Sequence, residues 1–460
     1  MTFGVRGIVE GFYGTPWTHA QRLDALSFLG AHDMNAYMYA PKDDEFHRAR
    51  WREPYSGAAI AEFAALRIAG DAAGVRVGFA ISPGLDISYA SQPERILLID
   101  KCGPLIDNGI DWFLLALDDI PMSNGLAEAQ ADLANWFLGE LEQRCARPSL
   151  MLCPTEYLGT TASKYTTDLA AELSTEVALM WTGPTVCSPQ ITTSDARAWK
   201  AALPRHNLVI WDNYPVNDGT MSTRLHLGPY RGRSHDLDSV AHGILLNPMN
   251  QALASRIPLA TAARYLVAPS SYDADAEFAA ACSDDQTLLF ATACYDGPPN
   301  PPATSPFHAL IDSILAAPTA TTASQRDQLH QELLLTKTAA KKLIASHSDF
   351  ATEVAQWAEC VVVECRAGLS ALKVLDLCAQ DPPPVLDEMG AMFTMAFHWS
   401  EARRSEHVVF GPRFAIYPAV VMHTSGQPAF NADAGIIEDC NAIDALCRFA
   451  AATSDEANAR

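Results

Sequence analysis

Eight short apolar segments, separated by helix-like intervals, constrain the fold of this chain more than any other feature. They are rich in β-branched and aromatic residues, end in polar or turn residues, and span residues 3–12, 35–41, 75–84, 111–119, 150–157, 177–184, 207–214 and 242–249. Each interval leaves room for a loop and a crossover helix. Near-continuous apolar strands that alternate with helices indicate a parallel sheet covered on both faces. Eight such units predict an α/β fold in which residues 1–270 form a closed (β/α)8 barrel, the TIM barrel.

The intervals carry recognisable helix starts. Thr18 and Ser56 are candidate N-caps, and Asn124 precedes a third helical segment. An open, doubly wound sheet is the structural rival. Such a sheet usually has fewer strands and a glycine-rich phosphate turn, which this sequence lacks.

The pattern changes after the barrel, and residues 271–460 predict an all-α helical domain. A long amphipathic stretch runs from Ser324 to about Cys378, between a loop at 297–306 and the breaker "DPPP" at 381–384, and two further helical segments follow. One of them carries a methionine and aromatic stripe, which we interpret as core packing rather than a binding groove. The stripe consists of Met389, Met392, Phe393, Met395, Phe397 and Trp399.

Charge and composition narrow the possible partners. The 460 residues carry a formal net charge of −22, which disfavours nucleic acid and anionic membranes as partners. No apolar run is long enough to span a membrane, and the chain starts with a strand-like segment, so we expect no signal peptide. Neither the eleven cysteines nor the thirteen histidines show metal-ligand spacing. We therefore expect a cytoplasmic protein with reduced thiols, no metal and no cofactor.

Polar residues collect where the eight predicted strands end, which is where a barrel of this type builds its site. Carboxylates, amides, a lysine and aromatic rings suit a neutral, polyhydroxylated ligand, and the tryptophans offer faces for a sugar ring. A glycoside hydrolase is the first hypothesis. The strand-end residues are Glu10, Gly11, Lys42, Asp43, Asp44, Asp86, Asp118, Asp119, Glu156, Tyr157, Thr182, Asp212, Asn213, Asp218 and Asn247, and the tryptophans are Trp17, Trp51, Trp181 and Trp211.

The segment "FLLALDDIP" ends a buried strand on two adjacent aspartates, Asp118 and Asp119. Conventional glycosidases hold two carboxyl groups roughly 5 to 9.5 Å apart across the scissile bond. Neighbouring residues, with Cα atoms about 3.8 Å apart, are instead suited to act on one side of it. One aspartate, its pKa raised by the neighbouring charge, would be the general acid. The other could hold a substrate group that attacks, such as a 2-acetamido group closing to an oxazoline. Helix capping or pairing with an arginine remains the alternative for this pair.

The ordered blocks "GIVEGFYGTPW", "NAYMYAPKDD", "WREPYS", "FAISPGLDI", "LALDDIP", "CPTEYLGT", "MWTGP", "IWDNYPVND", "LGPYRGR" and "LLNPMN" closely resemble glycoside hydrolase family 84, the O-GlcNAcases and related bacterial β-N-acetylglucosaminidases. The resemblance covers residues 4 to about 270 and implies a retaining, exo-acting β-N-acetylglucosaminidase. Its substrate would be a glycoprotein, a glycopeptide or a small GlcNAc glycoside. A protein that binds GlcNAc, with little hydrolytic activity, stays open as the alternative. The sequence does not indicate the oligomeric state.

The resemblance also assigns roles to individual residues. It implies that Asp118 orients and polarises the acetamido N–H, and that Asp119 is the general acid and then the base. The residues that it implies for substrate binding are Gly11, Lys42, Cys153, Tyr157, Thr182, Trp211, Asn213, Asp218 and Asn247.

Overall fold

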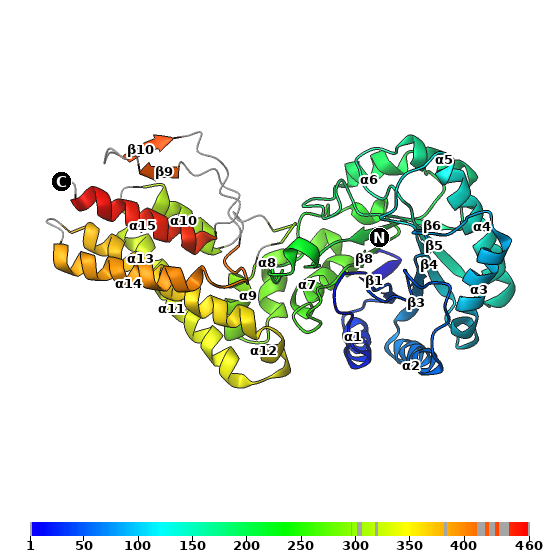
Figure 1. Ribbon diagram of the computed structural model, residues 1–460, viewed down its shortest axis with the longest axis horizontal. Helices are drawn as coiled ribbons and strands as arrows, with labels where there is room; N and C mark the ends of the chain where they lie inside the picture. The colour runs from blue at the N-terminus through cyan, green and yellow to red at the C-terminus, as the bar shows by residue number, and fades with distance from the viewer. Residues whose placement is uncertain are drawn as a thin grey trace. The chain divides into compact units, whose positions relative to one another are not determined.

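Eight parallel strands form a closed barrel, which confirms the fold predicted from the sequence (Figure 1). The computed structural model describes residues 2–295, 297–300, 306–317, 321–380, 384–411, 419–422, 428–431 and 441–458. The barrel strands are β1 (Val5–Glu10), β2 (Ala36–Tyr39), β3 (Arg76–Ile81), β4 (Trp112–Ala116), β5 (Ser149–Cys153), β6 (Ala178–Trp181), β7 (Leu208–Asp212) and β8 (Gly243–Leu246). Each strand pairs with the next in chain order. β8 closes the barrel on β1, with Val5 opposite Gly243 and Ile8 opposite Leu246.

The strands are apolar on both faces because one face fills the barrel and the other supports the helices. All five residues of β4 are buried. Val9, Met38, Leu114, Met151 and Leu245 belong to the cluster of side chains that fills the barrel. The polar residues that follow the strands are therefore held in place by a closely packed barrel.

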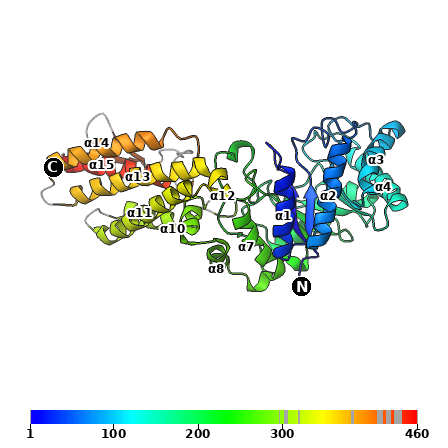
Figure 2. The same ribbon diagram turned by 90° about the horizontal axis from the view of Figure 1, so that it is seen from below.

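Seven helices follow the strands and surround the barrel in Figures 1 and 2: α1 (His19–Ala31), α2 (Gly57–Ala73), α3 (Gln92–Asp107), α4 (Leu126–Arg144), α5 (Lys164–Glu172), α6 (Thr193–Lys200) and α7 (Arg256–Val267). Thr18 caps α1 through a reciprocal capping box with Gln21, and Ser56 caps α2. Asn124 does not cap α4. Gly125 occupies that position with φ +75°, which a residue without Cβ adopts at little cost.

The chain divides into two units. Met1–Thr220 and Pro229–Glu277 form the barrel unit, and Met221–Gly228 and Phe278–Arg460 form the second unit. The remaining helices are α8 (Ala274–Ala281), α9 (Asp285–Ala293), α10 (Pro306–Leu315), α11 (Ala323–Ser346), α12 (Asp349–Glu353), α13 (Ala355–Cys378), α14 (Val385–Ala402) and α15 (Ala442–Asn458). Helix α13 packs against α11, α14 and α15 and forms the centre of the second unit (Figure 1).

The structure modifies the all-α expectation for this unit. β9 (Ala419–Met422) and β10 (Pro428–Asn431) form a two-stranded antiparallel sheet. The amphipathic stretch from Ser324 to Cys378 is also interrupted. His347 takes a positive φ of +49° and Ser348 caps α12, so the chain turns between α11 and α13. Residues 381–383 of the predicted breaker at 381–384, and residues 301–305 of the predicted loop at 297–306, lie outside the described residues.

The packing interpretation of the α14 stripe is wrong for three of its members. Phe393 and Phe397 are 74% and 69% exposed, and Met389 is 49% exposed. These three residues recur every fourth position, on a face that the described structure leaves open to solvent. Helix α14 packs instead through a different face that includes Ala391, Met395 and Ala402.

The described part of the chain has neither a candidate membrane-spanning helix nor a candidate metal site. No helix there combines the length and apolarity needed to cross a lipid bilayer. Within the same residues, no group of three or more His, Cys, Asp or Glu side chains is arranged to hold a metal ion.

Candidate active site

The adjacent aspartates follow β4 at the carboxyl end of the barrel, and they differ in their surroundings. Asp118 forms an ion pair with Lys42, which follows β2, and the side chains are only 8% and 3% exposed. The Lys42 ammonium also lies 5.6 Å from the centre of the Trp211 ring. Burial acts to lower the pKa of Lys42, but the Asp118 carboxylate outweighs it, and the pKa lies above its usual value. The pair is therefore charged, with Asp118 as the anion.

One oxygen of Asp118 stays available for a further bond. Its Oδ2 accepts from the Lys42 ammonium. Its Oδ1 is buried and has no hydrogen-bond partner among the described residues. A buried acceptor without a donor is costly, and such atoms are typical of functional sites. Asp118 is thus suited to accept an N–H or O–H from a bound molecule.

Asp119 is more exposed to solvent than Asp118, and its backbone has a positive φ of +56°, a left-handed conformation that aspartate tolerates better than most residues. Its Oδ1 accepts from the Tyr157 hydroxyl at 2.8 Å, and its Oδ2 accepts from the Tyr13 hydroxyl at 2.9 Å. Burial acts to raise the pKa of Asp119. The Lys42 charge and the two phenol hydrogen bonds outweigh it, so the pKa lies below the ordinary aspartate value.

This pKa direction differs from the sequence-based expectation, in which the neighbouring charge raises the pKa of the acid. The reason is Lys42, whose cation neutralises Asp118 and also acts on Asp119. In this structure Asp119 is therefore arranged as a base. Withdrawal of one of the two phenol donors would favour a proton on it.

Tyr13 and Arg48 were missed by the sequence analysis. Tyr13 lies in the loop after β1, and its hydroxyl accepts from the Arg48 guanidinium at 2.8 Å while donating to Asp119. The Arg48 guanidinium carbon also lies 5.7 Å from the centre of the Tyr13 ring. The only available signal was an aromatic residue two positions after Gly11, at the end of the first strand.

Four predicted residues from three strand ends form one connected amide network. Asn247 accepts from the Gly11 N–H at 3.2 Å and donates to Asn213 Oδ1 at 3.0 Å. The Trp211 indole N–H donates to the same oxygen at 3.0 Å. A Cβ on Gly11 would lie 2.3 Å from Trp211 Cζ2, so only glycine permits this close approach. The network fixes one wall of the site.

Three further predicted residues surround these groups. Asp218 accepts from the Tyr13 N–H at 2.8 Å, and burial, together with the Asp119 and Asp43 charges, raises its pKa. Thr182 donates its hydroxyl to the Thr185 carbonyl at 3.0 Å and is not oriented by a charged group. Cys153 belongs to the cluster inside the barrel, and burial raises the pKa of its thiol.

Other strand-end carboxylates are engaged in the scaffold. Glu10 is fully buried and pairs with Arg22, and Asp212 is buried and pairs with Arg233. Asp86 accepts from the Trp51 indole at 2.9 Å, and Asp44 accepts from the Tyr39 and Tyr55 hydroxyls. Carboxylates engaged by these partners orient loops, and they are not free to attack a substrate.

Three of the four tryptophans expected to offer a face to a sugar ring are buried away from the site. Trp51 and Trp181 are fully buried, and Trp17 is 3% exposed. Trp181 stacks on Trp199 at 5.8 Å between ring centres. Sequence position cannot distinguish a ring directed into the core from one directed into the site. Of the four tryptophans, Trp211 alone contacts the amide network.

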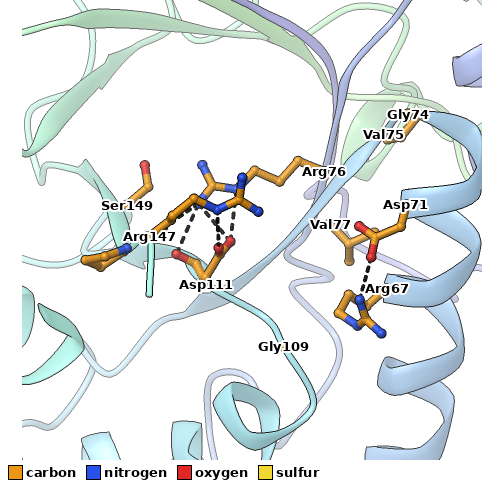
Figure 3. A pocket seen from close by; sticks show the side chains of 11 residues that line it. Arg67, Asp71, Gly74, Val75, Arg76, Val77, Gly109, Asp111, Arg147 and Ser149 are labelled. Carbon is orange, nitrogen blue, oxygen red and sulfur yellow. Dashed lines mark hydrogen bonds and ion pairs between the residues drawn. The ribbon is translucent and has the colours of Figure 1, made fainter. Parts of the chain in front are cut away.

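A hollow of about 610 Å³ lies at the opposite end of the barrel, and Figure 3 shows the side chains that line it. Its lining includes Arg76, Asp111 and Ser149, which lie at the amino ends of β3, β4 and β5. Arg76 and Asp111 form an ion pair at 2.8 Å, so the charges in this hollow largely neutralise each other. Barrels of this type carry their chemistry at the carboxyl ends, and we assign this hollow no catalytic role.

Comparison with known proteins agrees with this geometry. The β-N-acetylglucosaminidase family profile matches residues 6–292. The protein O-GlcNAcases of Rattus norvegicus and Mus musculus are each 35% identical over 275 residues, covering 56% of this chain and 29% of theirs. This chain thus spans less than a third of those relatives. The solved structure of a variant of the Thermobaculum terrenum O-GlcNAc hydrolase matches with a TM-score of 0.82 and 31% identity, over 88% of this chain and 91% of that one. The resemblance found in the sequence is confirmed, and this chain belongs to the β-N-acetylglucosaminidase family.

Proposed function

We propose that this chain is a retaining exo-β-N-acetylglucosaminidase that hydrolyses β-linked terminal GlcNAc, including O-GlcNAc on serine and threonine. The observation that carries the proposal is the Asp118–Asp119 pair. Asp118 is a charged, buried carboxylate with one oxygen that has no partner among the described residues, and Asp119 lies beside it between two phenols. A 2-acetamido sugar supplies the N–H that the first aspartate lacks.

The proposed reaction has two steps. In the first, the acetamido carbonyl oxygen attacks C1, the bond from C1 to the leaving oxygen breaks, and Asp119 transfers its proton to that oxygen. Asp118 accepts the acetamido N–H and stabilises the positive charge that develops on the nitrogen. In the second, Asp119 takes a proton from water, the water oxygen attacks C1, and the oxazoline opens. Two inversions at C1 give net retention.

The charge arrangement supports nucleophilic attack by the substrate rather than by an enzyme carboxylate. Glu10 and Asp212 are both held in buried ion pairs away from this chemistry. Asp118 is paired with Lys42, which weakens it as a nucleophile but preserves the negative charge that an oxazolinium ion needs.

The remaining site residues are proposed to hold the sugar. Tyr157 and Asn213 would position the acetamido group, with Trp211, Cys153 and Thr182 forming its pocket. The groups assigned to the sugar hydroxyls are Lys42, the Gly11 backbone, Asp218 and Asn247. The connected hydrogen bonds among Gly11, Asn213 and Asn247 support this assignment, because they present several polar atoms at one position.

Release of 4-nitrophenol from its GlcNAc β-glycoside tests the activity. We expect turnover that a GlcNAc-derived thiazoline inhibits competitively, with tighter binding than GlcNAc itself, because the thiazoline resembles the oxazoline. A protein that binds the thiazoline but releases no nitrophenol would be the GlcNAc-binding alternative, and our proposal would fail. A fluorosugar that labelled an enzyme carboxylate would exclude substrate assistance.

We also propose a bacterial, cytoplasmic enzyme acting on GlcNAc-bearing glycoproteins, glycopeptides or small glycosides. The likeness to the Thermobaculum protein over most of both chains supports the source. Buried free thiols such as Cys102, Cys153 and Cys365 are typical of a reducing compartment, and the charge of −22 disfavours nucleic acid and membrane partners. Fractionation of cells that carry the gene tests the location, and recovery in the periplasm or medium would contradict it.

A further inference from the structure

The two oxygens of Asp119 accept from different phenols, and the two phenols differ in what holds them. Tyr157 donates to Oδ1 at 2.8 Å, and Tyr13 donates to Oδ2 at 2.9 Å. Tyr157 follows β5 and is assigned to the acetamido group in the proposed function. Tyr13 has no such second task. Its hydroxyl is instead fixed by Arg48 at 2.8 Å.

The Arg48 contact determines the direction of the hydrogen bond between Tyr13 and Asp119. A guanidinium group donates and cannot accept, so the phenol oxygen is the acceptor in that pair. The single hydroxyl proton of Tyr13 is then directed at Asp119 Oδ2, and this hydrogen bond is strongest when Oδ2 carries no proton. The chain Arg48 to Tyr13 to Asp119 therefore has one direction.

We propose that Tyr13 is a positioning residue that, held by Arg48, keeps Oδ2 of Asp119 as a permanent acceptor and so assigns the catalytic proton to Oδ1. This inference rests on the proposed function, since a catalytic proton is meaningful only if Asp119 is the acid. The proposed function assigns no role to Tyr13 or Arg48 and does not distinguish the two oxygens of Asp119.

The assignment links substrate binding to protonation. When Tyr157 turns its hydroxyl to the acetamido oxygen, Oδ1 loses its donor while Oδ2 keeps Tyr13. The negative charge on Asp119 is then less stabilised, and Oδ1 takes a proton from solvent. The fixed Oδ2 prevents the carboxyl group from rotating, so that the proton on Oδ1 is directed at the leaving oxygen.

The test compares Tyr13→Phe with the wild type and with Tyr89→Phe. The control also removes one phenol hydroxyl from the barrel unit, but Tyr89 contacts Gln130 at 3.2 Å and has no part in the site. Removing a donor from a carboxylate favours its protonated form. The alkaline limb of the pH profile of kcat, which reports the enzyme–substrate complex, should therefore move up by roughly one pH unit in Tyr13→Phe and stay in place in Tyr89→Phe.

A second kinetic readout concerns the leaving group. Loss of orientation should lower kcat for phenyl GlcNAc β-glycoside several-fold more than for the 4-nitrophenyl glycoside, because only the poorer leaving group depends on a well-directed proton. A residue that is merely structural would lower both rates equally and leave the pH profile unmoved. That outcome, or a limb displaced to lower pH, would overturn the proposal.

A measurement without turnover separates this inference from the proposed function. In protein labelled with ¹³C at the aspartate carboxyls, the Asp119 signal is the one lost in Asp119→Asn. Its titration midpoint should rise by roughly one pH unit in Tyr13→Phe but not in Tyr89→Phe. An unchanged midpoint in an active enzyme refutes the inference alone. An inactive wild type that shows the shift refutes the proposed function while retaining the hydrogen bond.

Discussion

Replacing Lys42 with methionine should leave Asp118 as a buried carboxylate without its cation. Methionine fills a similar volume, so the substitution removes mainly the charge. The Lys42 and Asp118 side chains are 3% and 8% exposed, and water can replace little of the lost interaction. Asp118 must then pick up a proton to remain buried, and a neutral acid cannot stabilise the oxazolinium nitrogen.

The magnitude follows from the burial of the pair. Removing one partner of a buried ion pair costs about 3–5 kcal/mol. Loss of the cation favours the neutral form of Asp118, so the acid limb of kcat/KM should move to higher pH, and activity at pH 6 should fall more steeply than at pH 8.

The assay is a pH profile of nitrophenol release by the wild type, Lys42→Met and Lys101→Met. Lys101 is a matched control, since it is 4% exposed and its ammonium donates to the Glu53 carbonyl outside the site. Lys101→Met should lower stability without displacing the limb. If Lys42→Met raised KM and left the limb in place, Lys42 would serve only to bind the sugar, and our account of the charge on Asp118 would be wrong.

Three other substitutions test separate parts of the structure. Asp119→Asn should lose far more rate on phenyl than on 4-nitrophenyl glycosides, and equal losses would argue against Asp119 as the acid. Gly11→Ala puts a Cβ 2.3 Å from Trp211 Cζ2, so it should cost about 1–3 kcal/mol in unfolding free energy and weaken thiazoline binding, as calorimetry can check. Burial raises the pKa of Glu364 in the second unit to about 7, above the ordinary 4.5, so the folded state binds this proton more tightly than the unfolded state. Stability should therefore fall by up to about 3 kcal/mol as the pH rises from 4.5 through 7, and denaturant unfolding of Glu364→Gln should lack most of that fall.

The barrel can be predicted from the sequence because the patterns that indicate its strands and helices are local. Each strand is a short apolar run with a polar end, and each of α1 and α2 begins at a capping hydroxyl. The parallel strands of a barrel bring their carboxyl ends together regardless of loop conformation. Asp118, Asn213 and Asn247 can therefore be assigned to one site from the sequence alone.

The sequence does not show in which direction a side chain points. The pairing of Lys42 with Asp118, and of Tyr13 with Asp119, depends on loop conformation, including the left-handed backbone of Asp119. Trp181 ends β6 and Trp51 lies in the loop after β2, and both are fully buried, whereas Trp211 near the end of β7 bonds Asn213 through its indole N–H.

The same limit explains the α14 stripe. Helical spacing shows that Met389, Phe393 and Phe397 share a face, but not that the face is covered. Helix α14 packs through a face with small residues, Ala391 and Ala402, which carry little hydrophobic signal. Periodicity therefore identified the more conspicuous face, and of the stripe only Met395 is among the buried residues of α14.

The central claim is that the substrate's own acetamido oxygen is the nucleophile. The most direct test is kcat of the wild type on 4-nitrophenyl glycosides whose acetamido group carries zero, one, two or three fluorines. Electron withdrawal makes the carbonyl oxygen a poorer nucleophile, so kcat should fall steeply and steadily across the series. In Asp118→Asn the parent rate should already be lower by about 2.7–4 kcal/mol in activation free energy, with little change in KM. A wild-type kcat that is indifferent to fluorination would contradict the account, even if the enzyme hydrolyses every member of the series.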